Sequence, residues 1–166
     1  MKKTTKSTNN LFSKILVFFL IFITLSFSPL RVNAEMAITE IDGEEINTSA
    51  EFLRDLDYET WQLVVYKSSR EEGNLILRVI GYPGSLRIDH PQSLNVESGR
   101  KTWLLEDTTL SNIYLMNDNR QAAAEFDLDP LISDINQNRP LRLSLPGVFS
   151  ELPVPPFLVK EWRSLF

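Results

Sequence analysis

WQLVVYKSSREEGNLILRVIGYPG, residues 61–84, is the most informative stretch of the sequence, because it joins two apolar segments through a polar connector. Side chains alternate between the two faces of a strand, so Trp61, Leu63 and Val65 share one face of the first segment. The second segment places three more apolar residues on one face in the same way: Leu75, Leu77 and Val79. The pattern predicts a central β-hairpin whose two apolar faces meet in one core.

The opposite face of this hairpin is only partly polar. It would carry Gln62, Val64, Tyr66, Ile76, Arg78 and Ile80. A strand with apolar residues on both faces is usually covered on both, so this composition favours a closed or layered sheet over an exposed one.

Short apolar segments separated by turn residues continue through the rest of the chain. They predict further strands at 86–88, 94–96, 101–105, 112–116, 122–128, 141–145 and 148–153. The segment 141–145 alternates most regularly, because three leucines occupy every second position. In 122–128, Ala124, Phe126 and Leu128 share one face, while Glu125 and Asp127 share the other.

Three segments carry helical signals, and the last two are the helices that we include in the expected fold. Thr48 or Ser49 can cap a short helix that contains Phe52, Leu53 and Leu56. Asp129-Pro130 predicts a second short helix near residues 130–136, because proline is favoured in the first helical turn. A third begins near Phe157 and ends at Phe166. Its apolar stripe is Leu158, Trp162 and Leu165, and we expect this stripe to cover Ile76 and Ile80 on the outer face of the hairpin.

These elements predict a mainly β protein, a small antiparallel barrel or sandwich of about seven to nine strands, with one short internal helix and a C-terminal helix. The chain has no cysteine. Disulfides, iron–sulfur clusters and thiolate zinc sites are therefore excluded.

The first residues resemble an export signal. Four lysines precede an apolar run from Ile15 to Phe27, which is interrupted by Thr24 and Ser26, and Val32-Asn33-Ala34 offers small residues for cleavage. The run has 13 residues, whereas a membrane-spanning helix needs about 20. We therefore expect a cleaved signal peptide at 1–34 and a single domain at 35–166. The alternative is a retained membrane anchor.

The net charge of the chain bears on which classes of partner it can bind. The chain holds 17 basic and 22 acidic residues. Residues 1–34 contain five of the basic residues and no acidic one, so the remainder has 12 basic and 22 acidic residues and a net charge of −10. Nucleic acids and anionic membrane surfaces attract basic stripes. An acidic surface that maintains solubility is the simplest interpretation, and nucleic acid is not an expected partner.

Few residues in the sequence are candidates for catalysis or metal binding. Asp55, Asp57 and Glu59 alternate as in a calcium loop, but Thr60 and Tyr66 stand where such a loop needs glycine and glutamate. His90 is the single histidine, and we expect it to be a loop residue. Ser85 and Asp89 lie near it in sequence, but the G-x-S-x-G motif is missing. We therefore expect no catalytic residue, no metal site and no cofactor.

Five sequence blocks carry a resemblance to a known family: WQLVVYK, LILRVIGYPG, HPQSL, RPLRLSLPG and LPVPPFLVKEWRSL. Together they resemble a family of cyanobacterial exported proteins that is catalogued as a domain of unknown function. The resemblance implies a single domain in the periplasm or thylakoid lumen. It brings no established activity and no catalytic residue.

The expected function is that of an exported, non-enzymatic accessory or binding protein of a photosynthetic bacterium, acting with a protein partner at a membrane complex. One alternative is a small barrel that binds an apolar ligand, and another is a hydrolase that uses scattered acids. The residues expected to contact a partner are Tyr82, Pro83, His90, Trp162 and Arg163.

Overall fold

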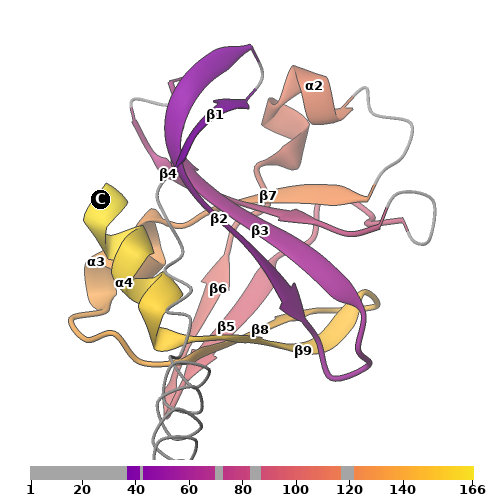
Figure 1. Ribbon diagram of the computed structural model, residues 1–166. Coiled ribbons are helices and arrows are strands. Elements are labelled where there is room, and N and C mark those ends of the chain that lie inside the picture. The colour runs from indigo at the N-terminus through magenta and orange to yellow at the C-terminus, as the bar shows by residue number, and fades with distance from the viewer. Residues whose placement is uncertain (1–36, 42, 70–72, 83–86, 117–121) are drawn as a thin grey trace, which may run out of the picture. The chain divides into compact units, whose positions relative to one another are not determined.

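Two antiparallel sheets form the framework of the protein in a computed structural model, which describes residues 37–41, 43–69, 73–82, 87–116 and 122–166 (Figure 1). The chain divides into two compact units, residues 1–33 and residues 34–166, and every described residue belongs to the second. The five-stranded sheet has the order β1-β2-β3-β4-β7 and the four-stranded sheet the order β6-β5-β8-β9.

The strands of the first sheet are β1 (Ala37–Ile41), β2 (Glu44–Arg54), β3 (Thr60–Lys67), β4 (Leu75–Ile80) and β7 (Ala123–Asp127). The second sheet contains β5 (Leu94–Ser98), β6 (Lys101–Leu105), β8 (Leu141–Leu145) and β9 (Phe149–Val154). The architecture is a mainly β sandwich rather than a closed barrel, which selects one of the two predicted alternatives.

The predicted hairpin is confirmed as the pair β3 and β4, in which Leu63 lies opposite Val79 and Val65 opposite Leu77. These side chains are buried in one core with the inward residues of the second sheet. Trp61 of β3 contacts Phe149 of β9 edge-to-face, with ring centroids 4.9 Å apart. Burial of both inner faces therefore joins the two sheets.

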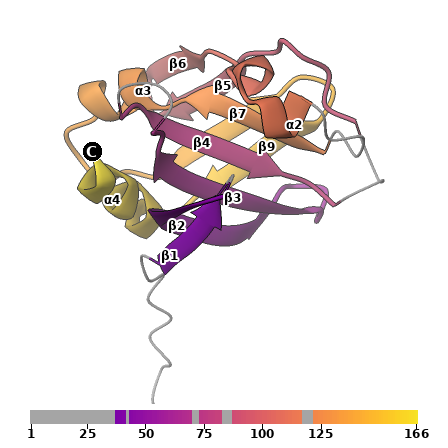
Figure 2. The same ribbon diagram turned by 90° about the horizontal axis from the view of Figure 1, so that it is seen from above.

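The described part of the chain contains three α-helices. They are α2 (Ile113–Met116), α3 (Asp129–Asp134) and α4 (Pro156–Leu165), and the 3₁₀ turn η1 (Thr109–Ser111) precedes the first. The predicted helix after Asp129-Pro130 and the C-terminal helix are both confirmed. In both views α3 and α4 lie at the same end of the sandwich (Figures 1 and 2).

The stripe on α4 has a different neighbour from the predicted one. Leu158 and Trp162 are buried in the core between the sheets, not against Ile76 and Ile80. The outer face of the hairpin forms a separate apolar cluster to which β1 and β2 contribute Ile41 and Ile46. That face is thus covered, as its composition predicted, but by the first strands of the same sheet.

Two other predictions about local structure are wrong, and a third is wrong for the residues that the structure describes. The expected helix containing Phe52 and Leu53 is part of β2, because pairing with β3 from Thr48 to Arg54 outweighs a capping signal. The expected strand at 112–116 is helical. Asn112 Oδ1 accepts the N–H groups of Tyr114 at 3.0 Å and Leu115 at 3.4 Å, so this side chain caps the helix. Of the expected strand at 86–88, Leu86 lies outside the described residues and the other two residues are not in a strand.

Candidate functional site

A cavity of about 410 Å³ opens where the β2–β3 turn meets the end of β4. We call it the aromatic groove, and its lining residues are Phe52, Tyr58, Glu59, Thr60, Gln62, Ile80, Gly81 and Tyr82. Phe52 is 64% exposed, Tyr58 80% and Tyr82 74%. Several solvent-exposed aromatic side chains around one cavity are typical of a binding surface.

A buried carboxylate fixes the turn that presents Tyr58. Asp55 Oδ1 accepts the N–H groups of Asp57 and Glu59, each at 2.9 Å, and its Oδ2 accepts the indole N–H of Trp61 at 2.9 Å. The N–H of Leu56 donates to the Glu151 carbonyl of β9 at 3.2 Å. The turn is therefore anchored to both sheets, and both carboxylate oxygens of Asp55 accept hydrogen bonds within it.

Tyr58 adopts a backbone conformation that disfavours bulky residues. Its φ is +65°, and it is the one non-glycine residue with positive φ in the described part of the chain. This region costs a residue with a large side chain about 1 kcal/mol or more. Because the ring is exposed, burial does not offset that cost. Strain retained without a packing benefit points to a role for the side chain itself.

The groove has an acidic rim. Glu59 belongs to its lining, and the exposed Asp57 lies in the same turn. Among the residues that the structure describes, no three acidic or histidine side chains gather in a geometry suited to a metal ion. The rim is therefore a source of negative potential beside aromatic surface.

His90 forms a pair with Asp107, with 2.7 Å between Nδ1 and Oδ2. Asp107 also accepts the N–H of Gln92 at 2.8 Å and the hydroxyl of Thr109 at 2.5 Å. Burial raises the pKa of Asp107, but the hydrogen bonds from Thr109, His90 and Gln92 together hold it below the usual range. The pair joins the loop before β5 to the segment after β6.

The serine–histidine–acid arrangement considered from sequence lacks its expected acid. Asp89 is 86% exposed and pairs with Arg87 at 3.2 Å, whereas the carboxylate beside His90 is that of Asp107. Ser85 lies outside the described residues.

A second buried carboxylate, Glu125 of β7, stands on the outer face of the five-stranded sheet with 2% of its side chain exposed. Arg78 approaches it to 2.6 Å, the Tyr66 hydroxyl donates to it, and Asn112 Nδ2 donates to both oxygens at 3.0 and 3.1 Å. The alternation of side chains predicts outward faces for Arg78 and Glu125 but does not predict that they pair. The pairing depends on the β4–β7 register, where Arg78 lies opposite Glu125.

The residues predicted to contact a partner lie in separate surroundings. Tyr82 lines the aromatic groove, and Pro83 lies outside the described residues. His90 is held by Asp107, and Trp162 is 1% exposed. Arg163 is half-buried, and its Nη1 donates to Asn138 Oδ1 at 2.7 Å. Phe52 and Tyr58 were missed, because exposure and a left-handed backbone at tyrosine leave no trace in hydropathy.

The fold and the groove define a class, a small antiparallel β-sandwich with an exposed aromatic surface at its strand ends. Residues 34–165 match the family of proteins of unknown function called DUF3122, and the chain belongs to that family. No curated protein and no solved structure matches the chain. Within the described residues, no helix is both long and apolar enough to cross a membrane.

Proposed function

We propose that the protein is an exported, non-enzymatic accessory protein that docks onto a partner protein through the aromatic groove. The N-terminal sequence supports export. The five sequence blocks support the periplasm or thylakoid lumen of a cyanobacterium and a partner that belongs to a membrane complex there.

The observation that carries the proposal is Tyr58. An exposed tyrosine in a left-handed conformation costs folding energy, yet its ring stands beside those of Phe52 and Tyr82 around one cavity. Tyrosine is enriched at protein interfaces, where its ring supplies apolar contact area and its hydroxyl a hydrogen bond. The fixed turn leaves the backbone at Tyr58 little conformational entropy to lose on binding.

The groove also specifies the chemistry of its partner segment. Aromatic walls favour apolar side chains, and the carboxylates of Glu59 and Asp57 favour lysine or arginine beside them. The partner segment is therefore an apolar stretch with basic residues next to it.

A small apolar ligand is the second candidate, and it would occupy the same groove. The fold is a sandwich whose two sheets share one apolar core, so we assign this ligand to the surface cavity rather than to a barrel interior. Binding of either occupant stabilises the folded state, and the two are separated by the mass of what is captured.

Photo-crosslinking tests the proposal. A crosslinking phenylalanine derivative placed at Tyr58 should capture one protein from membranes of the source organism, and Phe52→Ser should abolish that product. The matched control places the same group at Leu104, which is 71% exposed on β6. Equal products from both positions, or a product that survives Phe52→Ser, would contradict docking at the groove.

Tyr58→Gly provides a second test, because glycine adopts positive φ without strain. The variant should change the free energy of unfolding by less than about 1 kcal/mol, since relief of strain and the greater unfolded-state entropy of glycine oppose each other. It should nevertheless lose the crosslink introduced at Tyr82. A stable variant that still forms this product would show that the tyrosine ring is not part of the interface.

A further inference from the structure

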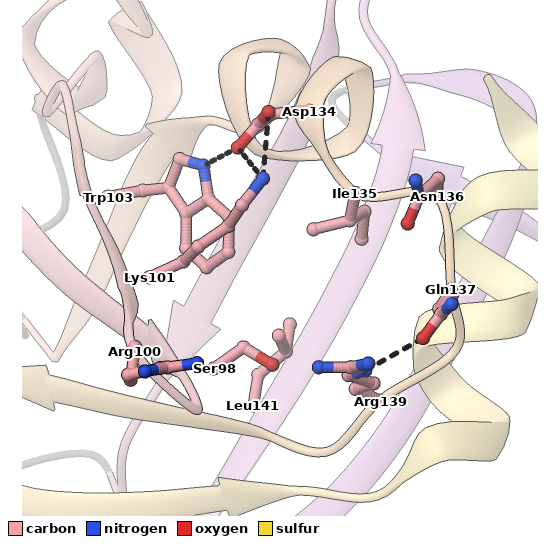
Figure 3. A pocket seen from close by; sticks show the side chains of 10 residues that line it. All are labelled: Ser98, Arg100, Lys101, Trp103, Asp134, Ile135, Asn136, Gln137, Arg139 and Leu141. Carbon is pink, nitrogen blue, oxygen red and sulfur yellow. Dashed lines mark hydrogen bonds and ion pairs between the residues drawn. The ribbon is translucent and has the colours of Figure 1, made fainter.

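A second cavity, of about 330 Å³, lies at the edge of the four-stranded sheet, between β6 and the connection from α3 to β8. We call it the Trp103 pocket (Figure 3). Its apolar wall consists of Trp103, Ile135 and Leu141. Leu141 belongs to the main core, and the other two side chains pack against that core.

Three cationic side chains and one carboxylate line this pocket, although the whole chain has a net charge of −5. Asp134 is occupied. Its carboxylate accepts Lys101 Nζ at 3.0 and 3.1 Å and the indole N–H of Trp103 at 3.0 Å. These donors hold the pKa of Asp134 below its ordinary value, so this carboxylate neutralises Lys101 and fixes the indole plane.

The two arginines keep their charge available. Within the described residues, Arg100 forms no ion pair, and neither does Arg139, whose Nε donates to Gln137 Oε1 at 2.8 Å. The guanidinium groups of both enter the pocket from opposite sides, one from the β5–β6 turn and one from the segment before β8 (Figure 3). Guanidinium groups bind carboxylates and phosphates through paired N–H donors.

We propose that the Trp103 pocket binds a small organic anion, with its carboxylate or phosphate between Arg100 and Arg139 and its apolar body against Trp103 and Ile135. A cavity of this size, with an apolar wall and a few converging polar groups, is typical of small-molecule sites. The proposal is independent of docking at the aromatic groove, because it uses the other sheet and other residues.

Tryptophan fluorescence gives a direct readout. The chain has three tryptophans, and Trp61 and Trp162 are each 1% exposed, so Trp103 is the one that a ligand in the pocket would contact. The full chain without its signal segment is titrated with benzoate, phenyl phosphate and inorganic phosphate. We expect saturable quenching by benzoate or phenyl phosphate that disappears in Trp103→Phe, and comparison of the two identifies the preferred head group.

Matched arginine variants locate the anion. Arg100→Ala and Arg139→Ala should each weaken binding at least about tenfold, because each removes a charged hydrogen-bond donor. Arg142→Ala is the control, since Arg142 lies on the same sheet, is 52% exposed and pairs with Glu97. All three arginines are exposed, so circular dichroism should show folded variants.

Three results would overturn the proposal. The first is the absence of saturation with both aromatic anions. The second is an equal loss in Arg142→Ala, which would indicate nonspecific attraction. The third is saturation by inorganic phosphate alone, because the apolar wall would then make no contribution.

Discussion

Glu125 and Asp134 stand at the centres of two networks that contain the same three kinds of group in opposite surroundings. Each carboxylate has a cation and an aromatic donor, Arg78 with Tyr66 in one case and Lys101 with Trp103 in the other. In both, the cation also lies over the ring, at 5.4 Å and 5.9 Å. The Glu125 side chain is 2% exposed, whereas that of Asp134 is 50% exposed.

Burial gives the two networks different roles. A buried carboxylate that loses its partners remains out of water and uncompensated, so the Glu125 network is coupled to folding. An exposed ion pair is screened by solvent and adds little to stability, so the Asp134 network can serve the adjoining Trp103 pocket instead. The same three kinds of group therefore stabilise the fold at Glu125 and line a surface pocket at Asp134.

Trp162→Ala has the largest expected effect on stability. It removes a buried side chain that carries no charge, and so it gives a reference for the two carboxylate networks. The ring is 1% exposed in the main core, so its removal should cost about 3–5 kcal/mol of the free energy of unfolding. Urea denaturation measures this value. A loss below about 1 kcal/mol would mean that α4 contributes little to the core.

Glu125→Ala should cost nearly as much, about 3 kcal/mol or more, because Arg78 would remain largely buried without its carboxylate. The same denaturation experiment on the double variant Arg78→Met with Glu125→Leu is the control. It should recover part of the loss, since the unpaired charge is then absent. A double variant less stable than Glu125→Ala would show that the ion pair itself is strongly stabilising.

The strands that carry the Glu125 network were predictable from the sequence, but the contacts within the network were not. Alternation with a period of two identifies β3, β4 and β8, because each has one fully apolar face. It does not pair Arg78 with Glu125, because they are 47 residues apart and meet through the sheet register. Local capping signals at Thr48 mispredict β2, because the competing stabilisation comes from strand pairing with β3.

The candidate site was predictable only in part for a similar reason. Tyr82 lies within the turn signal Gly81-Tyr82-Pro83-Gly84, and the sequence indicates that it is a contact residue. Tyr58 lies among alternating acids, and its role depends on the turn that Asp55 holds. Trp103 and Arg139 come from segments separated by η1, α2, β7 and α3, so only the folded chain brings them into one pocket.

Asp107 is a third carboxylate with several hydrogen-bond donors, and the pH dependence of stability measures what its ionised form contributes to folding. Its pKa in the folded protein lies below the ordinary value, and the ordinary value is about 3.9. A depressed folded pKa stabilises the protein above the unfolded pKa, and that contribution is lost as the pH falls through the folded pKa. Asp107→Asn should therefore destabilise at pH 7, by about 1 kcal/mol, and less below pH 3. Melting curves across this range measure it, and a loss independent of pH would show that folding does not lower the pKa of Asp107.

Asp134→Asn has the smallest expected effect on stability and completes the comparison. The carboxylate is half exposed and its partner Lys101 is 61% exposed, so water replaces the lost attraction and the urea midpoint should stay unchanged within error.

An asparagine oxygen can still accept the Trp103 indole N–H, which keeps the ring in place. Lys101 would then lose its neutralising partner, so the affinity of the Trp103 pocket for benzoate or phenyl phosphate should rise as the local charge becomes more positive. Denaturation and fluorescence titration of the same sample measure both quantities. A marked fall in stability would place Asp134 with Glu125 among the folding networks, and an unchanged affinity would remove it from the electrostatics of the pocket.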